Sequence, residues 1–298
     1  MAEGRAEEMY QNSRFITIRG LSIHYRIVRP IGPVRHRVFL LASPGQSTFN
    51  WRYIVPELTG TGCLCVLCDM PGYGLSECRD DAPQDHDTRA QYLWGLLDAL
   101  DMEEDGHLNC WHLMAHGSAA GTIAQMALMQ PDSAASLLML APVLYSPVPS
   151  VIRKMARRPG FTRLIRLFLR RYVLSAKRFA RITAYIYGAP LPEKALSQLH
   201  RPAAALIGHE EMLRQLLITG YELDMSRLND LFMPAMILWG GRDPLLGGTI
   251  PARLRAKDFS TAEYHVLSSA GHCPGETNSR AVRDFLRGWI RELWAGGQ

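Results

Sequence analysis

The stretch HLMAHGSAAGTIAQMA (residues 112–127) changes its character halfway along its length. Its first residues end an apolar run, its middle consists of small residues, and its last part carries apolar residues at helical spacing. We therefore expect a buried strand, a tight turn and a helix in direct succession, with Gly117 or Ser118 at the turn. The rest of the chain indicates which fold holds such a turn.

Strand-like and helix-like segments alternate along most of the chain. Residues 15–28 alternate apolar and polar positions around Gly20, which predicts a β-hairpin. Apolar runs that are typical of buried strands occur at residues 37–42, 63–70, 108–115, 136–143, 234–240 and 262–268. Helical periodicity separates most of these runs, and this alternation predicts an α/β fold with a doubly wound, mostly parallel sheet.

The alternation is interrupted once. From residue 143 to residue 230 helical patterns follow one another with no buried strand, and alternation then resumes. We therefore predict an α/β core at 14–142 and 231–298, with a helical insertion at 143–230.

The composition is that of an ordinary globular chain, with 47% hydrophobic and 20% charged residues. No apolar run approaches the roughly 20 residues that span a bilayer. The first fourteen residues are polar, so we expect no secretory signal and a location in the reducing cytoplasm. Half of the six cysteines fall in the apolar run at 63–70, where alternate residues face opposite ways. We expect free thiols rather than a metal site, and nothing in the sequence predicts a cofactor.

Three further motifs occur, and their order along the chain indicates a fold family. CDMPGYGLSE (68–77) resembles the D-x-P-G-x-G-x-S loop of the α/β-hydrolase fold family. WGGRDPL (239–245) resembles the family's acid loop, and SSAGHCPGE (268–276) resembles its histidine loop. The order of turn, acid and histidine is the family's order. The resemblance covers nearly the whole chain and implies an α/β-hydrolase fold with a helical cap, as in the esterase and epoxide-hydrolase branch.

The resemblance implies that Asp243 and His272 form a pair. The carboxylate would hold the tautomer and orientation of the imidazole, leaving the other ring nitrogen as a base. An Asp in this context also favours a turn, and a single His is often structural. The two positions taken together favour the pair. His116 lacks such a context, and we interpret it as structural or solvent-exposed.

The turn at 112–127 departs from the family pattern, which is small-x-nucleophile-x-small. Alignment of the preceding strand places Ala115 and Ala119 at the small positions and Gly117 at the nucleophile position. Glycine has no side chain with which to attack, although it relieves the strain of such a turn. The other register makes Ser118 the nucleophile, but it places His116 at a small position. We favour Gly117 at the tip of the turn, and Ser118 remains the alternative.

A second departure concerns the loop after the first buried parallel strand, where the family has a His-Gly pair followed by a backbone donor of the oxyanion hole. Counting back from Trp51 places Ser43 second in that pair and Pro44 next. Proline has no N–H to donate, and one lost donor costs about 3–4 kcal/mol of transition-state stabilisation. A shorter loop would make Gln46 the donor instead. A plain turn is compatible with either alignment, and Ala119 completes the expected pocket residues.

The sequence thus favours a hydrolase that acts on an ester or thioester of a small to medium apolar acid. His272 would be the base, Asp243 its orienting partner, and Ser118 the alternative nucleophile. In a second interpretation His272 acts on a water or a substrate proton without an acyl-enzyme. A third is a non-hydrolytic receptor, lyase or isomerase that uses only the His–Asp pair. An engineered replacement of serine by glycine is a further alternative.

Charge is distributed unevenly within the helical insertion. No acidic residue occurs between Asp132 and Glu193, whereas residues 151–192 carry eleven lysines and arginines. Helical spacing predicts one apolar face made of Leu164, Ile165, Phe168, Leu169 and Tyr172.

The arginines beside this face, Arg166, Arg170 and Arg171, are expected to contact an anionic group. Such a group could belong to an acidic carrier protein, a phosphorylated or CoA-linked acyl chain, or a lipid head group. The alternative is a solvated basic face, and contact with a membrane surface is less favoured. No motif supports nucleic-acid binding.

Overall fold

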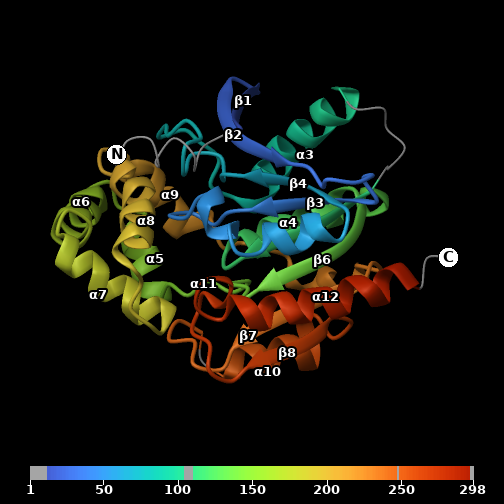
Figure 1. Cartoon of the computed structure of the whole chain (residues 1–298). Coiled ribbons are helices and arrows are strands. Elements are labelled where there is room, and N and C mark those ends of the chain that lie inside the picture. The colour runs from blue at the N-terminus through green and yellow to red at the C-terminus, as the bar shows by residue number, and fades with distance from the viewer. Residues whose placement is uncertain (1–11, 104–109, 247, 296–298) are drawn as a thin grey trace.

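Eight strands form one sheet within the described residues of the computed structural model, which are 12–103, 110–246 and 248–295 (Figure 1). Their order across the sheet is β1-β2-β4-β3-β5-β6-β7-β8. The strands are β1 Ser13–Ile18, β2 Leu21–Val28, β3 His36–Leu41, β4 Cys63–Cys68, β5 Trp111–His116, β6 Ala134–Leu140, β7 Ala235–Gly240 and β8 Glu263–Leu267.

The pairing of the strands confirms the predicted α/β fold with a mostly parallel sheet. β1 and β2 form the expected antiparallel hairpin, whose turn at Arg19 and Gly20 has positive φ angles of 50° and 80°. β2 runs antiparallel to β4, and all pairs from β4 to β8 are parallel. The first eleven residues and residues 108–109, the start of the predicted fifth strand, lie outside the described ranges.

Helices cover both faces of the sheet, as a doubly wound fold requires. α3 (His86–Glu103) and α4 (Ala119–Met129) pack on one face, and α2 (Val55–Gly60) and α12 (Ser279–Ala295) pack on the other. The same alternation divides the cysteines of β4, because Cys68 faces α3 and α4 whereas Cys63 and Cys65 face α2 and α12. All six cysteines are free thiols. Within the described ranges we find no helical segment with the length and hydrophobicity of a membrane span.

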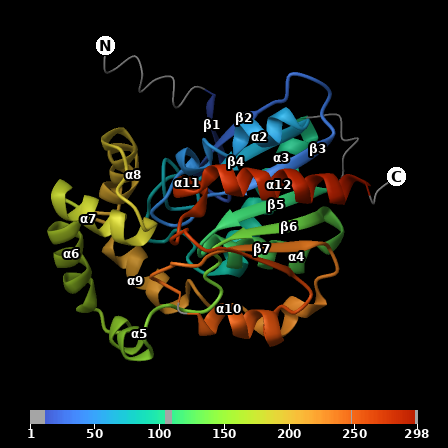
Figure 2. The ribbon, with the colours of Figure 1, turned by 60° about the horizontal axis from the view of Figure 1, so that its bottom comes forward.

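Five α-helices lie between β6 and β7 in the chain, and we call them the helical insertion. They are α5 (Ser150–Ala156), α6 (Phe161–Tyr172), α7 (Ala176–Tyr187), α8 (Glu193–Ala205) and α9 (Glu210–Thr219). Figures 1 and 2 show them grouped on one side of the sheet, with α6 outermost and α9 between α6 and the core. Because the insertion leaves the sheet at the carboxyl end of β6, it lies beside the loops that follow the other parallel strands.

The loop after β4 ties three segments together. Asp69 is fully buried, and its carboxylate accepts hydrogen bonds from the backbone N–H groups of Thr48 (2.6 Å) and Leu75 (2.8 Å). The same carboxylate lies 2.9 Å from Nδ1 of His24 in β2. The D-x-P-G-x-G-x-S motif therefore serves to hold loops at the carboxyl edge of the sheet, including the loop that carries Ser43.

Candidate active site

The turn between β5 and α4 is built on Gly117. Its φ angle is +59°, its N–H donates to the carbonyl of Leu140 (2.9 Å), and its carbonyl accepts from the N–H of Val143 (2.9 Å). Ser118 follows with right-handed angles, φ −71° and ψ −19°. Gly117 therefore carries the left-handed conformation, which costs residues with a Cβ about 1–2 kcal/mol and costs glycine little.

The side chains of His272 and Asp243 form a buried pair. Nδ1 of His272 lies 2.7 Å from Oδ2 of Asp243. Because an ionised carboxylate only accepts, Nδ1 carries the proton and Nε2 keeps its lone pair. Oδ1 of Asp243 accepts from the backbone N–H groups of Leu245 (2.8 Å) and Leu246 (3.2 Å). Asp243 thus shapes its own turn and orients the imidazole at the same time.

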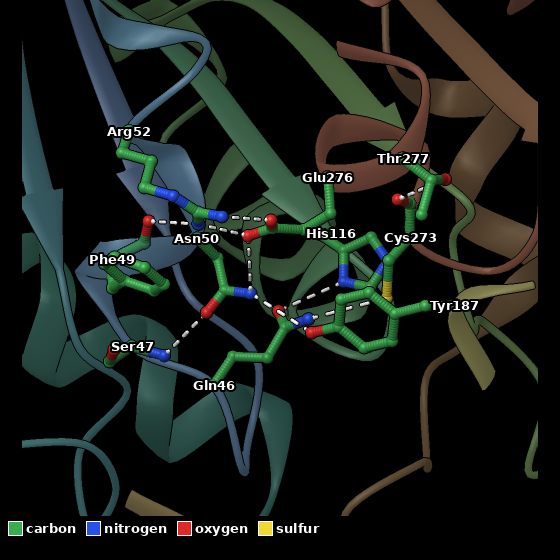
Figure 3. Close-up of polar contacts among 10 residues, drawn as sticks. All are labelled: Gln46, Ser47, Phe49, Asn50, Arg52, His116, Tyr187, Cys273, Glu276 and Thr277. Atoms are coloured by element: carbon green, nitrogen blue, oxygen red, sulfur yellow. Dashed lines mark hydrogen bonds and ion pairs between the residues drawn. The ribbon is translucent and has the colours of Figure 1, made fainter. Parts of the chain in front are cut away.

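Two neighbouring elements fix the backbone of His272. Its N–H donates to the carbonyl of Ile186 in α7 (3.1 Å), and its carbonyl accepts from Nε2 of His116 (2.8 Å). Burial lowers the pKa of His116 to about 3, so its imidazole is neutral. The other ring nitrogen of His116, Nδ1, lies 3.1 Å from Oε1 of Gln46 (Figure 3). His116 is therefore a buried support of His272, a role that its sequence context did not indicate.

The space beside Gly117 is bordered by two polar atoms. A Cβ built on Gly117 would lie 3.6 Å from Nε2 of His272 and 3.1 Å from Oγ of Ser43. The Ser43 hydroxyl donates to the carbonyl of His116 and accepts from the N–H of Ala119 (3.2 Å). Among the described residues, no hydrogen bond joins Ser118 to His272. The structure thus brings a basic nitrogen and a hydroxyl oxygen to the position that a side chain at residue 117 would occupy.

The loop after β3 forms a tight turn with consequences for the expected oxyanion donors. Gly45 has a φ angle of +81°, and the N–H of Gln46 donates to the carbonyl of Ser43 (2.9 Å), which with Pro44 at the second position makes a type II turn. The shorter-loop expectation is therefore wrong, because the turn itself uses the N–H of Gln46. Pro44 has none to donate. In the described part of the chain, the backbone N–H groups of Gly45 and Ser118 have no hydrogen-bond acceptor.

These loops and the helical insertion enclose a cavity of about 300 Å³. α7 and α8 supply most of its apolar wall, and the loops supply its polar atoms. None of the lining residues that the structure describes is Lys, Arg, Asp or Glu. The apolar side is made of Val143, Pro147, Phe179, Ile182, Ile186, Leu199 and Leu245. Such a cavity suits an uncharged ligand, because a charged group would be buried there without a partner of opposite charge.

A network of polar side chains adjoins the cavity at Tyr187 and Cys273 (Figure 3). Nδ2 of Asn50 donates to the hydroxyl of Tyr187 (3.3 Å) and to Oε1 of Glu276 (3.4 Å). Arg52 holds the Glu276 carboxylate through two hydrogen bonds of 2.5 Å. Burial raises the pKa of the Cys273 thiol well above its usual value, so the thiol stays protonated. The sequence offered no signal for this network, because its members come from three distant segments.

The arginines that the sequence predicts to contact an anionic group lie away from this cavity, on α6. Nη2 of Arg166 donates to Oε2 of Glu210 in α9 (3.0 Å), so Arg166 already has an anionic partner within the chain. Arg170 and Arg171 are exposed. The predicted apolar face of α6 is only partly buried, because Ile165 and Leu169 are buried whereas Leu164 and Phe168 are exposed.

Comparison with known proteins agrees with this fold. A model of the alpha/beta hydrolase family matches residues 38–285, and the chain therefore belongs to the α/β-hydrolase family. A 2-hydroxy-6-oxononadienedioate/2-hydroxy-6-oxononatrienedioate hydrolase of Cupriavidus pinatubonensis is 23% identical over 289 residues, covering 92% of this chain and 95% of the relative.

Two solved structures share the fold. A candidate lipase from Acinetobacter baumannii superposes with a TM-score of 0.79 at 15% identity, covering 99% of this chain and 97% of that one. The enol-lactonase from Burkholderia xenovorans gives a TM-score of 0.72 at 18% identity, with 93% and 100% coverage.

Proposed function

We propose that this protein hydrolyses an uncharged ester or thioester of an apolar acid, and that His272 activates a water molecule for direct attack. The observation that carries this proposal is the position of Nε2, 3.6 Å from the point where a Cβ on Gly117 would lie. The family's reaction needs a nucleophile at this point, and a water molecule can supply the oxygen that residue 117 does not.

The groups around this point can orient such a water. One proton would go to Nε2 of His272, which Asp243 holds in the correct tautomer. The second proton would be directed at Oγ of Ser43, whose own proton is directed at the carbonyl of His116. The water oxygen then keeps a lone pair for the carbonyl carbon of the substrate.

The bonds in this reaction balance without a covalent intermediate. A bond forms between the water oxygen and the carbonyl carbon as His272 accepts the proton. The N–H groups of Gly45 and Ser118 are our candidates for the donors that stabilise the oxyanion, because both residues line the cavity. The bond to the leaving oxygen or sulfur then breaks, and His272 returns the proton to the leaving group. The products are a carboxylic acid and an alcohol or thiol.

The lack of charged side chains among the described residues that line the cavity distinguishes the proposed substrate from those that the relatives' names give. Names such as 2-hydroxy-6-oxononadienedioate denote dicarboxylates. Burying a carboxylate without a cation costs several kcal/mol, and neither Lys nor Arg is among the described residues that line this cavity. An uncharged substrate therefore fits better. The six free thiols support a reducing cytoplasm as the place of action.

A second function is favoured by the absence of a side chain at Gly117. The His272–Asp243 pair could abstract a proton from a bound ligand, as a lyase or isomerase would, or the cavity could serve only to bind that ligand. In either case no ester bond would be broken.

The test uses a panel of uncharged p-nitrophenyl esters and aryl thioesters, a fluorophosphonate probe and mass spectrometry of the intact protein. The wild type should turn over a member of the panel without probe labelling and without an acyl adduct. His272→Ala should lower the rate about 100-fold or more, whereas Ser118→Ala and the control His265→Ala should leave it nearly unchanged. An acyl or phosphonate adduct on Ser118 or Ser43 would overturn direct attack by water. Ligand binding without any turnover would favour the second function.

A further inference from the structure

The outer side of α5, α6 and α7 combines cations with exposed apolar side chains. α6 buries only two residues, Ile165 and Leu169, against the rest of the helical insertion. Its outward positions include Leu167 and Phe168, which are 65% and 54% exposed. We call the following residues the outer face: Val151, Ile152, Met155, Arg157, Arg158, Arg163, Leu164, Leu167, Phe168, Arg170, Arg171, Leu174, Lys177, Arg178, Arg181 and Tyr185.

This face differs from the usual surface of a helix. Exposed helices normally turn polar residues outward, and single exposed apolar residues are scattered. Here seven large apolar side chains are exposed on three consecutive helices, and Leu174 between α6 and α7 is an eighth. Figures 1 and 2 show α6 at the outer edge of the molecule, with α9 between α6 and the core and α7 beside α6. Apolar groups gathered in this way indicate a contact surface.

We infer that the outer face binds the surface of a lipid bilayer that contains anionic lipids. Helices that lie in a membrane interface insert large apolar side chains between the lipids and place Lys and Arg beside the head groups. The segment from Ser133 to Pro192 has no acidic residue, so no carboxylate opposes an anionic surface there. The apolar side chains add a contribution that a purely ionic partner would not use.

The charge of the outer face argues against a second copy as its occupant. A symmetric dimer brings the same patch of each subunit together. Arg163, Arg170 and Arg171 would then meet like charges, with no carboxylate from the same segment to separate them. An anionic bilayer supplies the missing negative charge and an apolar interior at once.

The inferred contact also places the cavity near the bilayer. The inner side of α7 lines the cavity with Phe179, Ile182 and Ile186, whereas Arg178 and Tyr185 on the same helix are exposed. One helix is about 10 Å thick, so the cavity would lie roughly that far from the head groups. This inference does not depend on the reaction, because it concerns the outer side of the insertion alone.

The experiment is co-sedimentation of the full chain with vesicles. Phosphatidylcholine vesicles are compared with vesicles of phosphatidylcholine and phosphatidylglycerol in a ratio of about 3:1. We expect binding to the anionic vesicles only, and weaker binding as salt is raised. Arg170→Gln/Arg171→Gln should lower the partition coefficient about 30-fold, at roughly fivefold for each arginine. Leu167→Ser/Phe168→Ser should lower it about tenfold or more.

Matched controls lie elsewhere on the surface. Arg255→Gln/Lys257→Gln removes two exposed cations, and Phe232→Ser/Val266→Ser removes two apolar side chains that are 71% and 64% exposed. Both should bind vesicles nearly as well as the wild type. Equal binding to the two kinds of vesicle, or none to either, would overturn the inference. So would an unchanged affinity of the Leu167→Ser/Phe168→Ser variant, which would indicate an ionic partner. A dimer that this variant converts to a monomer would identify a second copy instead.

Discussion

At the scale of single residues, the two positions that depart from the expected family pattern are in contact. A Cβ at residue 117 would come within 3.1 Å of Oγ of Ser43, which is tighter than ordinary van der Waals contact. The hydroxyl at residue 43 thus takes space that a side chain at residue 117 would need. The glycine and the serine are physically coupled, and neither is an isolated substitution.

This coupling predicts the behaviour of Gly117→Ser. The new hydroxyl would lie beside Nε2 of His272, so the variant should gain fluorophosphonate labelling that His272→Ala abolishes. Its positive φ angle and the contact with Ser43 should lower the free energy of unfolding by about 1–2 kcal/mol. The double variant Gly117→Ser/Ser43→Ala should be more stable, by at least about 0.5 kcal/mol of unfolding free energy, than the sum of the two single effects predicts. Urea unfolding of the four proteins measures this, and strictly additive effects would contradict the coupling.

At the scale of elements, the helical insertion helps to hold the histidine loop. The N–H of His272 donates to Ile186 at the end of α7, and Gly271 lies so close that a Cβ there would be 2.6 Å from the carbonyl of Tyr187. The insertion therefore does more than line the cavity, because it sets where His272 lies.

Gly271→Ala should push this loop away from α7. We expect a loss of about 1–3 kcal/mol in unfolding free energy and, because His272 is displaced, a fall of about 100-fold in kcat/KM. Gly275→Ala in the short helix α11 (Pro274–Thr277), which follows this loop, is the control, since its Cβ would make an ordinary contact of 3.7 Å with Leu140. Equal effects of the two substitutions on kcat/KM would show that the contact with α7 does not position His272.

The ion pair between Arg52 and Glu276 joins two segments that border the site, the turn after Trp51 and the short helix Pro274–Thr277. Arg52→Met would leave a carboxylate whose side chain is 4% exposed without its cation, which should cost about 3 kcal/mol of unfolding free energy. The double variant Arg52→Met/Glu276→Met should be more stable than Arg52→Met alone, because no buried charge remains. Denaturant titration tests this, and a double variant that is less stable would refute it.

At the scale of the whole molecule, stability depends on histidines that are buried in the neutral form. Burial lowers the pKa of His86 and of His116 from 6.5 to about 3. Below pH 6.5 the unfolded chain binds protons at these residues and the folded chain does not. The stabilisation from the neutral rings is therefore complete above pH 6.5 and is lost as the pH falls toward 3.

We expect the unfolding free energy to fall by about 1.4 kcal/mol per pH unit for each of these histidines over that range. Urea unfolding at several values between about pH 7 and pH 4 measures the slope. This range covers the titration of histidine in the unfolded chain. His86→Gln should reduce the slope by the share of one histidine. An unchanged slope in His86→Gln would contradict the prediction.

Some features of this protein were predictable because they are local. The spacing of apolar residues identified the strands, the hairpin and the alternation of strands and helices along the chain, since each strand must bury its own side chains. The loops with Asp69, Asp243 and His272 followed from motifs of a few residues. Helical spacing groups Leu164 with Ile165 on one face of α6, but only packing on α9 decides which of them is buried.

The amino-acid sequence by itself determined the fold, the absence of a side chain at residue 117 and the basic character of the helical insertion. Only the tertiary structure decided that Ser43 and His272 flank Gly117, that His116 supports His272, and that the cavity lacks charge among its described lining residues. The physical reason is that these contacts join residues far apart in the chain. Their distances depend on how strands pair and loops pack, which no local pattern encodes.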